Sequence, residues 1–180
     1  MKIKLPTGIS VLIALVLVAF GLLYGTWSGY AADRAEITAL LERENGLMDV
    51  LDYRAADGVN LCVVARRHLS AGDEALTALE SAARALRDGA DLAQRCEADR
   101  GLAAAVEAVA AKLGSVPSFQ QSTRDQNYLS MLTSDLNNLS SSAAVAAYNR
   151  EAQAFNHELG SSPVGALAKL LGMEACPLYE

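Results

Sequence analysis

The stretch YNREAQAFNHEL, residues 148–159, repeats an aromatic–asparagine pair at an interval of seven residues. Seven residues make about two turns of an α-helix, so Tyr148 and Phe155 differ by about 20° in angle and share one face. Asn149 and Asn156 form a second row about 100° further round the same predicted helix. Three interpretations of these amides stay open: they lie in water, they pair across a buried helix seam, or they contact a ligand.

The composition around this stretch favours helices throughout. The chain has 180 residues, enough for one ordinary domain with a real core; 52% of them are apolar and only 6% aromatic. Alanine is frequent, as in GLAAAVEAVAAKLG at residues 101–114, and alanine is the best helix former. Beyond the N-terminal part, no alternating run of β-branched residues suggests a strand. We therefore expect an all-α fold.

The N-terminal part is typical of a membrane span. No charged side chain occurs between residues 5 and 32, and residues 9–27 read ISVLIALVLVAFGLLYGTW. As a helix these residues extend over about 28 Å, close to the hydrocarbon thickness of a bilayer. We predict a short cytoplasmic segment over residues 1–8, a transmembrane anchor over 9–30 and a helical-bundle domain over 31–180.

The charges that flank the span predict its orientation. Lys2 and Lys4 precede it, whereas Arg34 is offset by Asp33 and Glu36 on the other side. Positive residues favour the cytoplasmic side. We expect a single-pass protein of the cell membrane with a cytoplasmic N-terminus and an extracytoplasmic domain.

A cleaved signal peptide is the alternative to a retained anchor. Residues 29–31 offer small side chains around a cut. Against cleavage, the apolar run is longer than the ~7–15 residues usual for a signal peptide. The prediction is a retained signal-anchor.

The formal net charge of −6 limits the partners. Nucleic acids need patches of lysine and arginine, and basic residues here are scattered among acids. We expect no nucleic-acid partner; besides the membrane, the expected partners are other envelope proteins or a second copy of the chain.

The cysteines and histidines do not suggest a metal site. Cys62, Cys96 and Cys176 are widely spaced, so either one pair is bridged or the thiols are buried, as the apolar run around Cys62 favours. His68 and His157 are far apart in the sequence and are expected on helix surfaces. We predict neither a metal nor another cofactor.

The apolar spacing predicts where the helices run. One helix is expected to continue from the span to about residue 56, with a turn at Asp57–Gly58. A second runs over 59–87, with either a kink or a break at 70–75. Further helices are expected over 90–114 and 120–159, followed by a short helix that ends before Gly172 and Pro177.

Catalytic motifs are lacking in the sequence. There is no glycine-rich phosphate loop, no G-x-S-x-G elbow and no H-E-x-x-H. The carboxylates scatter along helix faces, as solvated charge does. We predict that the protein is not an enzyme and has no catalytic residues.

At residues 148–159 the chain resembles the LemA family of bacterial membrane-anchored helical proteins. The resemblance rests on the two aromatic–asparagine pairs, the later proline, the apolar tail with PLYE, and the upstream stretch YRAADGVNLCVVA. The motif and packing residues are Asn60, Leu61, Tyr148, Asn149, Phe155, Asn156 and Pro163. Where the family commonly has an acid and an arginine, this chain has Asn138 and Val145, so we expect the charged network of those positions to be absent.

The resemblance implies an antiparallel up-and-down four-helix bundle on one transmembrane anchor, without an established enzymatic activity. It suggests an interaction or scaffolding module of the cell envelope. The alternative function is a binding module that presents a groove to a peptide or an envelope polymer.

Overall fold

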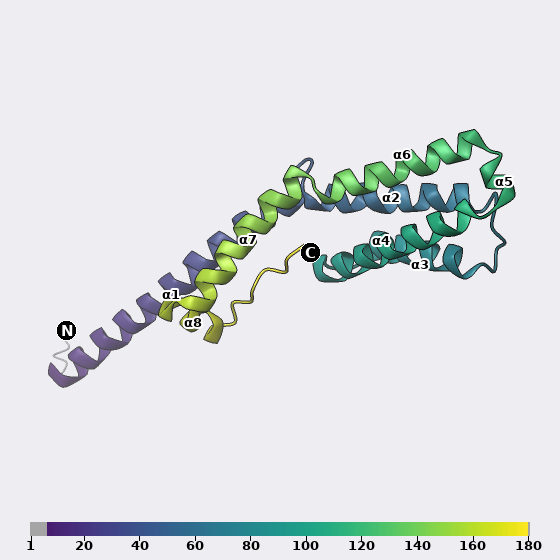
Figure 1. The fold of residues 1–180 in the computed structure, drawn as a ribbon. Coiled ribbons are helices and arrows are strands. Elements are labelled where there is room, and N and C mark those ends of the chain that lie inside the picture. The colour runs from purple at the N-terminus through teal and green to yellow at the C-terminus, as the bar shows by residue number, and fades with distance from the viewer. Residues whose placement is uncertain (1–6, 180) are drawn as a thin grey trace. The chain divides into compact units, whose positions relative to one another are not determined.

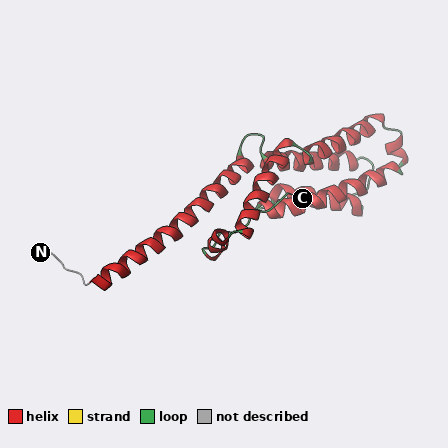
Figure 2. Cartoon of the chain, turned by 60° about the vertical axis from the view of Figure 1, so that its left-hand side comes forward, coloured by secondary structure: helices red, strands yellow, loops and turns green. Residues whose placement is uncertain are grey.

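The computed structural model describes residues 7–179, which form helices and connecting loops without a strand (Figure 2). The all-α prediction is confirmed. The helices of these residues, labelled in Figure 1, are α1 (Thr7–Glu42), α2 (Leu47–Ala65), α3 (Glu74–Asp88), α4 (Leu92–Gly114), α5 (Pro117–Gln120), α6 (Thr123–Ser140), α7 (Ala143–Ser161) and α8 (Pro163–Leu170). They divide into two compact units, residues 7–38 with 151–176 and residues 39–150 with 177–179.

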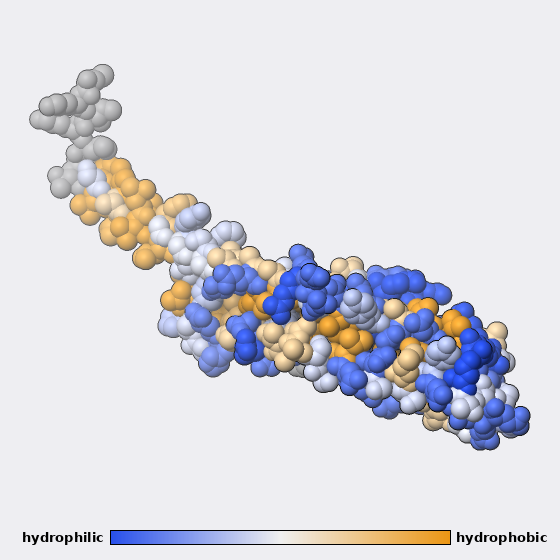
Figure 3. All heavy atoms as spheres, turned by 90° about the horizontal axis from the view of Figure 1, so that it is seen from above, coloured by the Kyte–Doolittle hydropathy of each residue, from blue (hydrophilic) through white to orange (hydrophobic). Residues whose placement is uncertain are grey.

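Helix α1 carries the apolar run with its side chains exposed. Leu17 is 65% and Phe20 is 68% exposed, and Figure 3 shows this part of the helix as a mostly apolar surface. Among the described residues, α1 belongs to the one stretch that is long and apolar enough to cross a membrane. Most of the predicted cytoplasmic segment 1–8, including Lys2 and Lys4, lies outside the described residues.

The first helix ends earlier than predicted. Helix α1 stops at Glu42, and residues 43–46 form a turn. Asn45 adopts the left-handed conformation with φ 57°, and the Gly46 amide donates a hydrogen bond to the Arg43 carbonyl at 2.7 Å. An Asn–Gly pair is a strong turn signal, and here it overrides the apolar stripe that suggested a continuous helix.

The predicted turn at Asp57–Gly58 is wrong, because both residues lie inside α2. Gly58 serves close packing instead of a turn. A Cβ atom on it would lie 2.9 Å from Leu102 Cδ1 and 3.1 Å from Ala83 Cβ, closer than ordinary contacts allow. The missing side chain therefore lets α3 and α4 approach α2.

Residues 66–73 separate α2 from α3, so the segment 70–75 contains a complete break and not a kink. Asp73 caps α3, since its Oδ1 accepts hydrogen bonds from the amides of Ala75 at 2.9 Å and Leu76 at 3.3 Å. Lys112 of α4 pairs with the same carboxylate at 2.5 Å. The cap satisfies amides that the first turn of a helix leaves unbonded.

The helix predicted over 120–159 is divided, whereas the one predicted over 90–114 is confirmed as α4. The division falls at Ser141, between α6 and α7. The hydroxyls of Ser140 and Ser141 donate to the Asn137 carbonyl at 2.7 and 3.3 Å. Serine side chains that bond to nearby backbone compete with the helical pattern, so this serine run ends α6.

The core of the second unit forms around α2. Helix α2 contacts α3, α4 and α6, and α3 also contacts α4. Fully buried side chains from these helices include Leu47, Leu51, Leu61, Leu76, Leu79, Leu86, Leu102, Val109 and Leu113. Each such side chain contributes about 1.5–3 kcal/mol to folding through burial.

The cysteines are not bridged. Cys62, Cys96 and Cys176 are free and buried, which excludes the disulfide and agrees with buried thiols. Burial raises the pKa of Cys62 and of Cys96 to about 11.

Candidate functional site

A buried charged centre lies in the second unit, where α2, α4 and α6 meet the extended segment after α8. Arg54 on α2 donates from Nε to Asp99 Oδ1 on α4 at 2.6 Å. It also donates from Nη1 to the Leu136 carbonyl of α6. Tyr179 donates its hydroxyl to the other carboxylate oxygen of Asp99 at 2.6 Å. Each oxygen of Asp99 therefore has its own donor.

This centre is almost excluded from water. Arg54 and Asp99 are each 4% exposed and Tyr179 is 8% exposed. Burial, followed by the hydrogen bond to the Asp99 carboxylate, raises the pKa of Tyr179 well above its usual value. A phenol held in this way stays neutral and remains a hydrogen-bond donor. A cavity of about 150 Å³ lies beside Arg54, lined by side chains of α2, α4 and α6.

The sequence signal for Arg54 and Asp99 is their position within apolar stripes. On α2 the buried positions run Leu51, Arg54, Ala55 and Gly58, and on α4 they run Leu92, Arg95, Cys96, Asp99 and Leu102. A charge at a core position of an amphipathic helix must be paired. This rule identifies Arg54 and Asp99 as buried charges that need a partner, but it does not predict which residues they pair with.

Asn149 holds the main chain of the extended segment. Its Nδ2 donates to the Tyr179 carbonyl at 2.6 Å, and its Oδ1 accepts from the Tyr179 amide at 2.9 Å. Next to it on α7, the buried Tyr148 donates its hydroxyl to the Pro177 carbonyl at 2.7 Å. The Asn149 amide thus bonds to one residue as a neighbouring β-strand would.

Asn156 makes the same pair of bonds within the first unit. Its Nδ2 donates to the Cys176 carbonyl at 2.8 Å, and its Oδ1 accepts from the Cys176 amide at 2.7 Å. Phe155 beside it meets Tyr30 of α1 edge-to-face, with ring centroids 5.9 Å apart. The amides of Asn149 and Asn156 therefore bond to the chain's own extended backbone and not to another helix.

The remaining motif residues have separate places. Pro163 starts α8 at a position where a proline is well accommodated. Leu61 is completely buried in α2, whereas Asn60 is exposed. Asn60 lines a shallow surface pocket of about 210 Å³ with Tyr128 and Met131, among others. Within the second unit, Asn60 therefore lies at this surface pocket and not at the charged centre.

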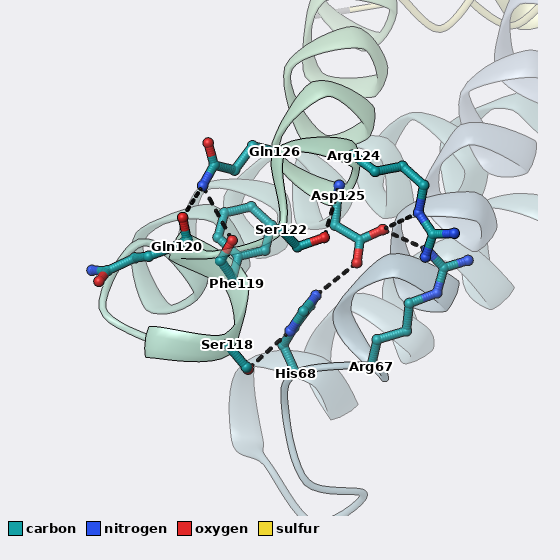
Figure 4. A network of polar contacts seen from close by, with 9 residues as sticks. All are labelled: Arg67, His68, Ser118, Phe119, Gln120, Ser122, Arg124, Asp125 and Gln126. Atoms are coloured by element: carbon teal, nitrogen blue, oxygen red, sulfur yellow. Dashed lines mark hydrogen bonds and ion pairs between the residues drawn. The ribbon is translucent and has the colours of Figure 1, made fainter.

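A second polar network surrounds His68, which follows α2 and is not the simple surface residue expected from the sequence (Figure 4). Its Nε2 lies 2.9 Å from Asp125 Oδ2, and its Nδ1 lies 3.0 Å from the Ser118 hydroxyl. Arg67 and Arg124 also bond to Asp125, at 2.5 and 3.3 Å. The hydrogen bond from His68 is the largest of the causes that lower the pKa of the Asp125 carboxyl well below its usual range.

The order serine, histidine, aspartate resembles a hydrolytic triad, but its bonding differs. In serine hydrolases the nucleophile meets Nε2 and the carboxylate meets Nδ1; here the two nitrogens are exchanged. The charge of Asp125 is also shared with two guanidinium groups, so less of it remains to stabilise an imidazolium. The network braces the end of α2 against α5 and the start of α6.

Within the described part of the chain, no group of three or more histidine, cysteine, aspartate or glutamate residues is placed to hold a metal ion. No family model, curated protein or solved structure matches the chain.

Proposed function

We propose that the chain is a membrane-anchored interaction or scaffolding module of the LemA type, displayed outside the cytoplasm. The main support for the membrane anchor is the exposed apolar surface of α1, which includes Leu17 and Phe20. Apolar surface in water costs about 25 cal/mol per Å², and a bilayer removes that cost. Lys2 and Lys4 before the span support a cytoplasmic N-terminus.

The contacts of Tyr30 support a retained anchor. This residue lies on α1 at the end of the predicted anchor, where cleavage of a signal peptide would cut the chain. Its ring packs on Phe155, its hydroxyl lies 3.2 Å from the Ser162 hydroxyl, and only 6% of its surface is exposed. Cleavage at residues 29–31 would cut α1 at this packed position.

The helices of the second unit support an up-and-down bundle. In our proposal α2, α3, α4 and α6 are its four antiparallel helices. Only residues 89–91 connect α3 with α4, and short connections favour antiparallel neighbours. The contacts of α2 with each of the other three fit this arrangement.

Membrane extraction tests the anchor. Full-length protein should stay in the membrane pellet after alkaline carbonate treatment, and Leu17→Lys should move a large share to the supernatant, because a charge in the span opposes insertion. Val63→Lys is the matched control, since Val63 is 45% exposed on α2, and it should stay in the pellet. Equal behaviour of the two variants would contradict the anchor.

We also propose that the module has no hydrolytic activity. The serine of the His68 network is bonded through the ring nitrogen opposite to the one used in hydrolases. A fluorophosphonate probe should therefore not label Ser118. Labelling that disappears in Ser118→Ala would show an activated hydroxyl.

A peptide-binding module is the second candidate, favoured by one observation. Asn149 and Asn156 each bond to both the amide and the carbonyl of one residue in an extended segment. Such bonding to main chain is how many proteins hold peptides. An affinity purification of the full-length protein from native membranes would identify envelope proteins or peptides bound to it.

A further inference from the structure

We propose that Asn149, Asp99 and Arg54 form a binding site for an extended peptide that presents a tyrosine. In this structure the chain's own residues 177–179 fill that site. The proposal rests on the interaction module proposed above and specifies what such a module binds. Every residue of the site belongs to the second unit.

The first element of the site is independent of the ligand's side chains. Asn149 bonds to both main-chain groups of Tyr179, and Tyr148 bonds to the Pro177 carbonyl. The segment from Met173 to Tyr179 contains no regular secondary structure. Its amide and carbonyl groups are therefore not used within a helix, and those of Tyr179 and the Pro177 carbonyl bond to side chains of α7. Any extended peptide could supply the same amide and carbonyl groups.

The second element is selective for a phenol. Arg54 occupies one oxygen of Asp99, and the Tyr179 hydroxyl occupies the other. Because Asp99 is only 4% exposed, a ligand that lacks a donor would leave a charged oxygen buried without a partner. Such an oxygen is costly, which favours tyrosine over phenylalanine at this position.

The third element is the buried ion pair itself. Apolar side chains of similar volume often stabilise a core as well as a buried ion pair does. At this point the pair adds an acceptor that recognises a hydroxyl group. The same two helices therefore supply both the core around the site and its selectivity.

A peptide titration tests the proposal. A fluorescein-labelled peptide with the sequence of residues 173–180 is added to detergent-solubilised full-length protein, and binding is followed by fluorescence anisotropy. The wild-type protein should bind weakly, because its own segment competes at an effective concentration on the order of millimolar. Tyr179→Ala in the protein weakens that competitor and should increase the affinity for the peptide at least about tenfold.

Two comparisons identify the proposed contacts. A peptide with phenylalanine in place of Tyr179 should bind at least about tenfold more weakly, as expected for the loss of a hydrogen bond to a charged group. Adding Asn149→Ala to the Tyr179→Ala protein should weaken binding, whereas adding Asn127→Ala, at an exposed amide on α6, should not. If Tyr179→Ala does not unfold cooperatively, Tyr179→Phe replaces it in the same titration, because it keeps the ring.

Two results would overturn the proposal. One is the absence of saturable binding by a variant that still unfolds cooperatively. The other is equal affinity for the tyrosine and phenylalanine peptides. Neither result affects membrane extraction, so failure of the peptide site and failure of the anchored module can be told apart.

Discussion

Removing one partner of the Arg54–Asp99 pair should strongly destabilise the second unit. Asp99→Leu deletes the carboxylate that bonds to Arg54 at 2.6 Å, and it leaves a guanidinium that is only 4% exposed without its counter-charge. Breaking a buried ion pair in this way costs about 3–5 kcal/mol. We therefore expect Asp99→Leu to lower the free energy of unfolding by about that amount.

The double variant Arg54→Met/Asp99→Leu separates the cost of an unpaired charge from the cost of lost packing. It removes both charges together, so it should be more stable than Asp99→Leu alone by about 1–3 kcal/mol. It still loses the donor to the Leu136 carbonyl and the acceptor of the Tyr179 hydroxyl. It should therefore not regain the full stability of the wild type.

Urea unfolding of the full-length protein in detergent, followed by far-UV circular dichroism, measures these differences. Glu97→Gln is the matched control, because Glu97 lies on the same helix with its side chain 75% exposed; it should change the free energy of unfolding by less than about 0.5 kcal/mol. If Asp99→Leu behaved like this control, the buried pair would not exist in solution. The same conclusion would follow if the double variant lost as much free energy of unfolding as Arg54→Met and Asp99→Leu lose in sum.

Three further predictions follow from particular contacts. Gly58→Ala should destabilise the protein by about 1–3 kcal/mol, because its Cβ would meet Leu102 at 2.9 Å. Gly101→Ala, with open space around it, should stabilise by about 0.5–1 kcal/mol; equal shifts in melting temperature would contradict the close packing. The buried thiols of Cys62 and Cys96, whose pKa is raised to about 11, should react with iodoacetamide at mildly alkaline pH only as fast as the protein unfolds. The pKa of Tyr179 is raised by burial, so its contribution to stability is complete below its unfolded pKa of about 10 and is lost as pH rises through the folded value. Urea unfolding at a series of alkaline pH values should therefore show a loss of stability that Tyr179→Phe lacks.

Local chemistry explains which parts of the fold could be predicted. The all-helical composition, the helix over 90–114 and the break at Gly172 follow from propensity and from turn signals within a few residues. The predictions failed where one local signal competed with another: the Asn45–Gly46 turn lay inside an apolar stripe, and the serines at the end of α6 interrupted a second stripe. In both cases the helix ends at the hydrogen-bonded turn, although the apolar face continues beyond it in the sequence.

The charged centre could be predicted only in part. Arg54 and Asp99 occupy apolar stripe positions, so their burial and their need for a partner follow from the helical period. Their pairing joins residues 45 positions apart, and the third member, Tyr179, lies 80 positions beyond Asp99. Helical spacing cannot predict that contact, because the period describes one element and the contact depends on how several elements pack.

The two asparagines show why a repeat can be visible in a sequence while its partner is not. Seven residues of α-helix advance about 10.5 Å, and three residues of extended chain advance about 9–10 Å. An amide repeated every seven helical residues therefore matches an extended segment that is bonded at every third residue, and the bonded residues are Cys176 and Tyr179. A primary amide is suited to this task because it offers a donor and an acceptor to the amide and carbonyl of one residue. The partner is backbone, which every residue has, so no side-chain pattern in the tail could reveal it. The interval between Asn149 and Asn156 is the sequence feature that corresponds to the bonded extended segment.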